Sequence, residues 1–340
     1  MLVQQTRIWS PVGPLLHRLV VAWLCYHEAM SRDTQPCNRH RLAAAIVHFG
    51  TPEQTAACVA ALHRSHRTVD HLVVVDNGSG DRRLRDSLEN VDWIEAPNNL
   101  GFAGGANLGI RRVLDAGASR VLLINSDAVV EPDCLGILES AIEPPGVGLA
   151  GPAIVSARDP AMLESTGIAY APLTGRMRLS GWGKRVDAAG GPAHPVDALS
   201  GCALMIRREV FDRVGLLPEE YFFGFEDLDF CLRAHAAGFL ALCAPDARVL
   251  HQGGASLAPG SPDRIYFATR NHLLLAQRVR PLPAPLSALR AANIVALNLA
   301  YLALHAKVPR MAGVRALASG FADYCTGRFG ARVTAASRSR

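Results

Sequence analysis

Two groups of acidic residues, far apart along the chain, are the parts of this sequence best suited to chemistry. Asp127 directly follows the apolar run 121–124, and the pair Glu226 and Asp227 opens a segment with apolar residues at helical spacing. A carboxylate at the carboxyl end of a parallel strand lies where open α/β sheets bind ligands. A carboxylate within hydrogen-bond reach of a bound hydroxyl can take its proton. The two groups therefore predict two different roles.

These acids need a scaffold, and the sequence predicts one in which strands and helices alternate. Apolar runs bounded by turn residues predict strands at 42–48, 72–75, 91–96 and 121–124. Helix starts are expected at Thr51 and Asp81, and a further helix is expected over 106–116 after a glycine-rich turn. Strands that alternate with helices at this spacing indicate a doubly wound, mostly parallel α/β sheet with right-handed crossovers.

Two of the predicted turns carry further polar groups. Asp76 and Asn77 follow the strand 72–75, where the carboxylate of Asp76 can accept hydrogen bonds from a nucleoside or, equally, cap the next helix. The segment 98–107 is rich in glycine and enters a helix, so its backbone N–H groups are suited to a phosphate. It does not fit GxGxxG, and the chain has no GxxxxGK[ST], which disfavours a Rossmann dehydrogenase and a P-loop enzyme.

Composition predicts a globular, cytoplasmic protein. The chain is 49% hydrophobic, with a net charge of +5, and has no helix-turn-helix or zinc-finger pattern, so nucleic acid is not an expected partner. Its eight cysteines are scattered without a CxxC pair and are expected to be reduced. Residues 1–40 are expected to form a poorly ordered extension, because the apolar run 15–25 is too short to span a membrane and no convincing cleavage site follows it.

Several motifs in order carry a resemblance to a known family. They are VVVDNGSGD, NNLGFAGGANLGI, LLINSDAVV, the long segment from SGCALMIRREV to FGFEDLDFCLRAHAAGF, and VLHQGGAS. Over residues 41–275 the chain resembles the family-2 glycosyltransferases, especially their rhamnosyltransferase-like branch. The resemblance implies a GT-A fold and an inverting transfer from a nucleotide-diphosphate sugar of the dTDP or UDP type, with rhamnose as the leading donor. It also implies Mn²⁺ or Mg²⁺ on the diphosphate and a glycan or polyprenyl-linked acceptor.

The same resemblance assigns roles to residues. It makes Asp227 the general base, Asp127 and His251 metal ligands, and Asp76 the residue that binds the nucleotide base. Glu226 is expected to bind or orient the acceptor. Asn125 stands where the family's metal motif has its first acid, so a direct three-ligand protein site is not assured. The residues expected to bind the nucleotide sugar are Asp76, Asn77, Asn99, Gly101, Gly104, Asn107, Asn125, Ser126 and Gly201.

The chain is expected to divide into a catalytic domain at 41–262 and a helical extension at 263–340. Within the extension, residues 284–305 are apolar and basic residues continue to Arg340, which fits either peripheral association with the inner face of the membrane or a helical cap on the sheet. Residues 156–199 are expected to line the acceptor side, and Asp229 to pair with Arg233. Two other functions stay open: a sugar-nucleotide nucleotidyltransferase and a non-catalytic carbohydrate-binding homologue.

Overall fold

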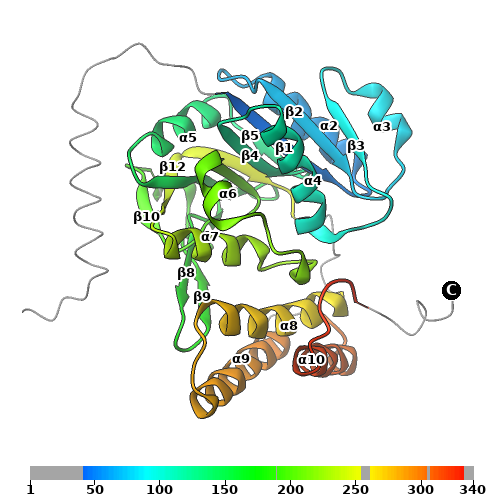
Figure 1. Ribbon diagram of the computed structural model, residues 1–340, viewed down its shortest axis with the longest axis vertical. Coiled ribbons are helices and arrows are strands. Elements are labelled where there is room, and N and C mark those ends of the chain that lie inside the picture. Colours follow the sequence, from blue (N-terminus) through cyan, green and yellow to red (C-terminus); the bar gives the residue numbers. More distant parts are fainter. Residues whose placement is uncertain (1–40, 189, 254–260, 305–306, 333–340) are drawn as a thin grey trace, which may run out of the picture.

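The computed structural model describes residues 41–188, 190–253, 261–304 and 307–332 (Figure 1). The predicted extension 1–40 and the last basic residues, Arg338 and Arg340, lie outside these ranges. The strands are β1 Leu42–His48, β2 His71–Asp76, β3 Asp92–Glu95, β4 Arg120–Asn125, β5 Ala128–Val130, β6 Val147–Ser156, β7 Leu163–Ser165, β8 Ile168–Ala171, β9 Arg176–Leu179, β10 His194–Val196, β11 Ala203–Arg207 and β12 Leu240–His251. The helices are α2 Pro52–His63, α3 Arg82–Ser87, α4 Gly101–Asp115, α5 Cys134–Ile142, α6 Arg208–Val214, α7 Glu226–Ala236, α8 Pro262–Val279, α9 Ala284–Leu304 and α10 Arg310–Cys325.

The main sheet is mixed and mostly parallel, as the alternating pattern predicted. Its strand order is β10-β12-β6-β11-β4-β1-β2-β3, with β5 and β7 paired at its side. The nucleotide-side strands β3, β2, β1 and β4 are all parallel, whereas β11 runs antiparallel between β4 and β6. This antiparallel insertion brings the chain back beside β4, at the edge where Asp127 lies.

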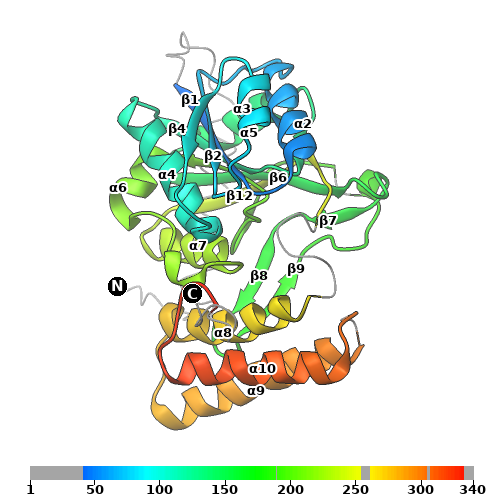
Figure 2. The ribbon, with the colours of Figure 1, turned by 90° about the vertical axis from the view of Figure 1, so that its right-hand side faces the viewer.

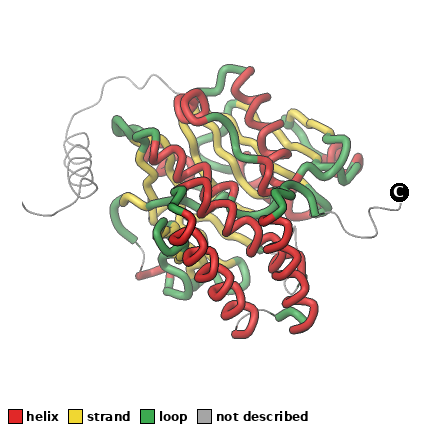
Figure 3. Tube along the Cα trace, turned by 60° about the horizontal axis from the view of Figure 1, so that its bottom comes forward, coloured by secondary structure: helices red, strands yellow, loops and turns green. Residues whose placement is uncertain are grey.

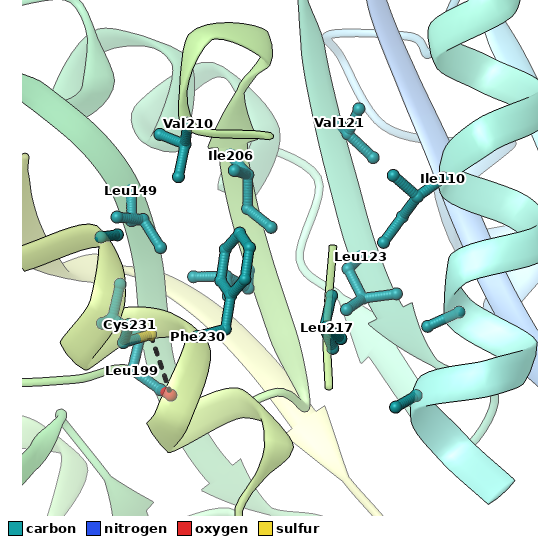
Figure 4. Close-up of a cluster of buried hydrophobic side chains, with 14 of the residues drawn as sticks. Ile110, Val121, Leu123, Leu149, Leu199, Ile206, Val210, Leu217, Phe230 and Cys231 are labelled. Atoms are coloured by element: carbon teal, nitrogen blue, oxygen red, sulfur yellow. Dashed lines mark hydrogen bonds between the residues drawn. The ribbon is translucent and has the colours of Figure 1, made fainter. Parts of the chain in front are cut away.

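Helices cover both faces of the sheet because the central strands are apolar on both sides. The odd-numbered residues of β1, from Ala43 to Val47, pack with α4, α6 and α7 in one cluster. The even-numbered residues, from Leu42 to Ile46, pack with α2 and α5 in another. Figure 4 shows part of the first cluster, where Phe230 of α7 lies among the aliphatic side chains of β6 and β11.

The helix predicted over 106–116 begins five residues earlier, at Gly101, so the glycine-rich segment is largely helical. The reason lies in the side chains that hold its start: Asn99 accepts from the backbone N–H of Gly101, and Asn77 accepts from that of Leu100. Gly101 has a φ of +75°, and a Cβ there would lie 2.4 Å from the carbonyl oxygen of Phe222. Only glycine fits this approach without strain.

The C-terminal helices form a separate layer. In Figures 1 and 2, α8 lies below the sheet and α9 and α10 lie beyond it, with the β8–β9 hairpin reaching down to them. Residues of α8, α9 and α10 share one small apolar cluster that also touches Phe222 and Phe223. The layer therefore contacts the loop that leads into α7.

Candidate active site

A single cavity brings together most of the residues predicted to act on a substrate. Its volume is about 400 Å³. Ten of the predicted site residues line it: Asn77, Asn99, Gly101, Asn125, Ser126, Asp127, Gly201, Glu226, Asp227 and His251. Residues distant in sequence thus meet at one edge of the sheet, where ligands bind in open α/β folds.

The segment before β11 connects the two acidic groups. The backbone N–H of Asn125 donates to the carbonyl oxygen of Cys202, which ties this segment to the end of β4. One residue earlier, the backbone N–H of Gly201 donates to Oδ2 of Asp227 at 2.7 Å. A Cβ on Gly201 would lie 3.1 Å from Asp227, so a side chain here would crowd the carboxylate.

Asp127 and His251 form a carboxylate–imidazole pair. They lie close together because Asp127 directly precedes β5, and His251 of β12 pairs with Ala128 of β5. Nε2 of His251 is 3.5 Å from Oδ1 of Asp127, and its Nδ1 is 2.8 Å from Oε2 of Glu164. Burial lowers the pKa of His251, but the hydrogen bonds and charges of Asp127 and Glu164 outweigh it and raise the pKa to about 9.

This pair has donors that suit a divalent cation. A carboxylate oxygen and an imidazole nitrogen are suitable ligands for Mn²⁺, and two protein ligands leave positions for phosphate oxygens and water. Among the residues that the structure describes, no group of three or more His, Cys, Asp or Glu side chains is close enough to hold a metal alone.

Glu164, which the sequence analysis did not single out, orients the imidazole. It lies on β7, and its hydrogen bond to Nδ1 leaves Nε2 of His251 facing Asp127. A partner of this kind fixes the tautomer and ring orientation of a ligating histidine. We expect Glu164→Ala to weaken Mn²⁺ binding to the donor-free protein by about 10- to 100-fold, measured by the EPR signal of free Mn²⁺.

The matched control is Glu164→Gln, whose amide oxygen still accepts from Nδ1–H and should keep most of the affinity. Equal affinities in the wild type and Glu164→Ala would show that Glu164 has no part in positioning His251.

Glu226 and Asp227 are neighbours at the start of α7 with different surroundings: Glu226 is buried, and Asp227 is half-buried. Asp227 accepts backbone hydrogen bonds from Gly201 and Leu228, at 2.7 Å each. Oε2 of Glu226 has no hydrogen-bond partner among the described residues. Burial raises both pKa values; repulsion by Asp227 raises that of Glu226 further, to about 8, whereas the backbone N–H groups partly offset the shift of Asp227. With a pKa of about 8, Glu226 is mostly protonated at neutral pH.

A bell-shaped dependence of turnover on pH follows from this pair. With Asp227 as the predicted base, activity should fall in acid as Asp227 gains a proton, and fall above about pH 8 as Glu226 loses the proton with which it can donate. Glu226→Gln keeps a donor at every pH, so its profile should lack the alkaline fall. An unchanged alkaline limb in Glu226→Gln would assign that limb to another group.

The loop before α7 has a strained backbone, and hydrogen bonds from α8 hold it in place. Phe222 and Phe225 have φ values of +62° and +78°, which residues other than glycine rarely adopt. The side-chain amide of Asn271 donates to the carbonyl oxygens of Tyr221, Phe223 and Gly224. These bonds over-determine the loop conformation, and they make the helical layer part of the catalytic scaffold.

A third acid near this loop, Asp229, has a structural role. Asp229 is buried and pairs with Arg233 at 2.6 Å, as predicted, and accepts a hydrogen bond from the hydroxyl of Tyr221. It does not line the cavity. Its role is to hold α7 and the preceding loop together.

Three predicted nucleotide-binding residues do not line the cavity. Asp76 is buried, and its two oxygens accept from the backbone N–H groups of Ser79 and Asp81, so it shapes the turn into α3. Asn107 holds the segment near Leu217 through its side-chain amide. Gly104 lies in α4, and a Cβ there would lie 2.7 Å from the side chain of Leu100.

Several residues that line the cavity had no signal as site residues in the sequence. Phe222, Phe223 and Gly224 come from the loop before α7, and Arg264 and Phe267 from the first turns of α8. The apolar residues look like ordinary core positions in a linear pattern. Only the fold of the helical layer against the loop makes them part of the site.

Comparison with known proteins decides the family. The model for "Glycosyltransferase like family 2" matches residues 40–271, well over half of the chain. The chain belongs to glycosyltransferase family 2. This family-2 chain is 27% identical over 220 residues to the dTDP-rhamnosyl transferase RfbF of Shigella flexneri, covering 61% of this chain and 71% of that one. It is 30% identical over 202 residues to the N-acetylglucosaminyl-diphospho-decaprenol L-rhamnosyltransferase of Mycobacterium tuberculosis, covering 53% and 66%.

Solved structures of similar fold confirm the GT-A architecture of this family-2 enzyme. The mannosyltransferase PcManGT of Pyrobaculum calidifontis, in complex with GDP-Man and Mn²⁺, aligns with a TM-score of 0.50 at 17% identity, covering 96% of this chain and 86% of that one. GalNAc-T7 with UDP, GalNAc and Mn²⁺ aligns with a TM-score of 0.51 at 13% identity, covering 88% and 68%. The predicted fold class is confirmed, and the chain is a glycosyltransferase of the rhamnosyltransferase-like branch.

Proposed function

We propose that this glycosyltransferase moves rhamnose, with inversion, from a dTDP- or UDP-type donor to a hydroxyl of a glycan or lipid-linked acceptor. The observation that carries the proposal is the convergence of two unlike groups on one cavity: the Asp127–His251 pair and the Glu226–Asp227 pair. The first suits a cation on the diphosphate, and the second suits the incoming alcohol. The dTDP-rhamnosyl transferase of Shigella flexneri supports the choice of donor by its name.

In this mechanism the acceptor oxygen forms a bond to the anomeric carbon while the bond from that carbon to the diphosphate oxygen breaks. Asp227 takes the hydroxyl proton, and the nucleoside diphosphate leaves with the bonding electrons. Protonated Glu226 orients the acceptor through its unpartnered Oε2. A divalent cation, Mn²⁺ or Mg²⁺, held by Asp127 and His251, would neutralise the charge that develops on the leaving group.

The nucleotide sugar is proposed to lie along the part of the cavity lined by Asn77, Asn99, Gly101, Asn125 and Ser126. The N–H groups of Gly101 and Phe102 already donate to Asn99 and to the carbonyl oxygen of Phe222. The amide of Asn77 is also engaged, since it donates to Asn99 and to the carbonyl oxygen of Gly101 and accepts from Leu100. The side chains of Asn99, Asn125 and Ser126 are therefore proposed to contact the donor. Gly201, which has no side chain to crowd Asp227, is proposed to leave room there for the sugar.

We further propose that the enzyme works on the cytoplasmic side of a membrane. The mycobacterial relative is named for an acceptor on diphospho-decaprenol, which is held in a bilayer. The mildly basic chain, with a net charge of +5, suits an anionic surface.

Thermal stability against a panel of nucleotide sugars, with and without Mn²⁺, tests the proposed donor. A ligand at 100 times its Kd stabilises by about 2.7 kcal/mol, so the true donor should stand out, with dTDP-rhamnose expected to give the largest Mn²⁺-dependent shift. A larger shift with a GDP- or CMP-linked sugar would overturn the choice of donor. No shift with any nucleotide sugar would count against the proposed site.

A further inference from the structure

Helix α9 buries polar side chains and exposes apolar ones. Its buried residues follow a spacing of four and are Arg290, Ile294, Asn298 and Leu302. Two of these four are polar, whereas a helix on a water-soluble protein usually buries an apolar stripe and exposes polar residues. The 21-residue helix has a mean hydropathy of 1.4, yet only 22% of its most apolar window is buried.

The outward side of α9 carries no charged residue. Arg290 is the only Lys, Arg, Asp or Glu residue between Ala284 and Leu304, and its side chain is buried. The large apolar side chains on the exposed side are Leu286, Leu289, Leu299, Tyr301 and Leu304, with exposed fractions from 43% to 75%. Exposed apolar surface of this extent marks a contact with a protein or a membrane.

Helix α10 extends the apolar surface and adds positive charge. Met311, Val314 and Phe321 are exposed, with Met311 at 68%. Lys307, Arg310 and Arg315 are also exposed and lie in the connection to α10 or on the helix itself. The one acid in the stretch 284–325, Asp323, is half-buried and accepts a hydrogen bond from Tyr266.

Two polar side chains, the buried Arg290 and the exposed Asn293, fix α9 along the surface of the protein. Nη1 of Arg290 donates to the carbonyl oxygens of Pro172 and Arg280, and the amide of Asn293 donates to that of Thr174. The tip of the β8–β9 hairpin and the end of α8 therefore keep α9 packed along the protein surface. A helix attached along its length in this way is suited to lie in a membrane interface rather than to cross the bilayer.

We propose that α9 and α10 together form a surface that docks in the plane of an anionic phospholipid membrane. Charge complementarity selects this occupant: the apolar side chains enter the acyl boundary, and Lys307, Arg310 and Arg315 meet the lipid phosphates. A second copy of the chain would bring the same three positive charges to the contact, which disfavours a dimer through this face. Figure 3, in which the bottom of Figure 1 comes forward, shows the two helices side by side in the lower part of the picture.

The position of this surface suits a lipid-linked acceptor, a consequence that rests on the proposed function. Helix α8 lies between the sheet and the helices α9 and α10 (Figure 2). Its Phe267 lines the cavity and belongs to the apolar cluster that includes Leu302 and Leu317 of α9 and α10. Two helical layers, α8 and then α9 with α10, lie between the docking face and the cavity. Each layer is about 8–10 Å deep, so the reacting end of a lipid-linked acceptor has to extend about 20 Å from the membrane surface.

Flotation of the full chain with vesicles, in the absence of donor, tests the surface. The wild type should bind vesicles containing phosphatidylglycerol and bind pure phosphatidylcholine vesicles weakly. Leu289→Glu combined with Leu304→Glu should lower the partition coefficient by about 10² or more, since two leucines lose their burial. Neutralising Lys307, Arg310 and Arg315 to Gln should lower binding to the anionic vesicles on the order of a hundredfold, with little change on the neutral ones.

The matched control is Leu179→Glu, which places the same charge on an exposed leucine at the far end of the β8–β9 hairpin and should bind like the wild type. Circular dichroism and donor turnover in solution, both expected to match the wild type for all three variants, separate a docking defect from misfolding and from failure of the proposed chemistry. Unchanged vesicle binding in the double leucine variant would overturn the proposal. Two other results would also overturn the proposal. One is a wild-type dimer, stable in lipid-free solution, that the double leucine variant converts to monomers. The other is wild-type protein that stays with the vesicles through carbonate extraction.

Discussion

Asp227→Asn is expected to lower turnover by about 10² or more while leaving donor binding nearly intact, because the acceptor hydroxyl then lacks a base. The amide keeps the size of the carboxylate and one acceptor oxygen for the N–H groups of Gly201 and Leu228. Steady-state kinetics with saturating donor measures the turnover, and calorimetry with the donor and Mn²⁺ measures the binding.

Asp229→Asn is the matched control, since Asp229 is a buried acid on the same helix that does not line the cavity. It should lower the free energy of unfolding by weakening the pair with Arg233, by about 1–3 kcal/mol, and change turnover much less. A loss of donor affinity in Asp227→Asn as large as its loss of turnover would remove Asp227 from the role of base.

Asp127→Ala is expected to abolish the contribution of Mn²⁺ to donor binding. Asp127 supplies the carboxylate of the proposed cation site, and His251 alone gives one ligand, too few to hold the ion against water. Calorimetric titration of the donor should therefore give the same Kd with Mn²⁺ and with EDTA in this variant, whereas the wild type should bind more tightly with Mn²⁺.

Asp133→Ala serves as its control, because Asp133 is a highly exposed acid a few residues along the same chain segment. It should bind donor and Mn²⁺ like the wild type. Donor affinity in Asp127→Ala that still responds to Mn²⁺ would place the cation elsewhere.

The sequence predicted the alternating scaffold well because strands such as 121–124 are apolar on both sides and end in polar turns. It failed at the start of α4, where side chains outside the helix decide the outcome: Asn77 and Asn99 hold its first N–H groups. Residue propensities predict a loop for a segment rich in glycine. No local sequence pattern indicates that the side chains of Asn77 and Asn99 will accept hydrogen bonds from the first N–H groups of the helix.

The candidate site divides in the same way. Asp127, Asp227 and His251 follow or open regular elements, so their position at the sheet edge was predictable. Glu164 was not, since it comes from a short strand paired with β6 and meets His251 only through the sheet. The loop before α7 depends on Asn271, which is distant in sequence and reads as an ordinary polar residue of a helix.

The most direct test of the central claim, that two unlike acidic groups act on one bound sugar nucleotide, is identification of the product released from the donor. Wild-type protein with dTDP-rhamnose, Mn²⁺ and an acceptor should release nucleoside diphosphate, and both Asp127→Ala and Asp227→Asn should reduce that release by about 10² or more. Release of pyrophosphate, or turnover that neither substitution changes, would contradict the account.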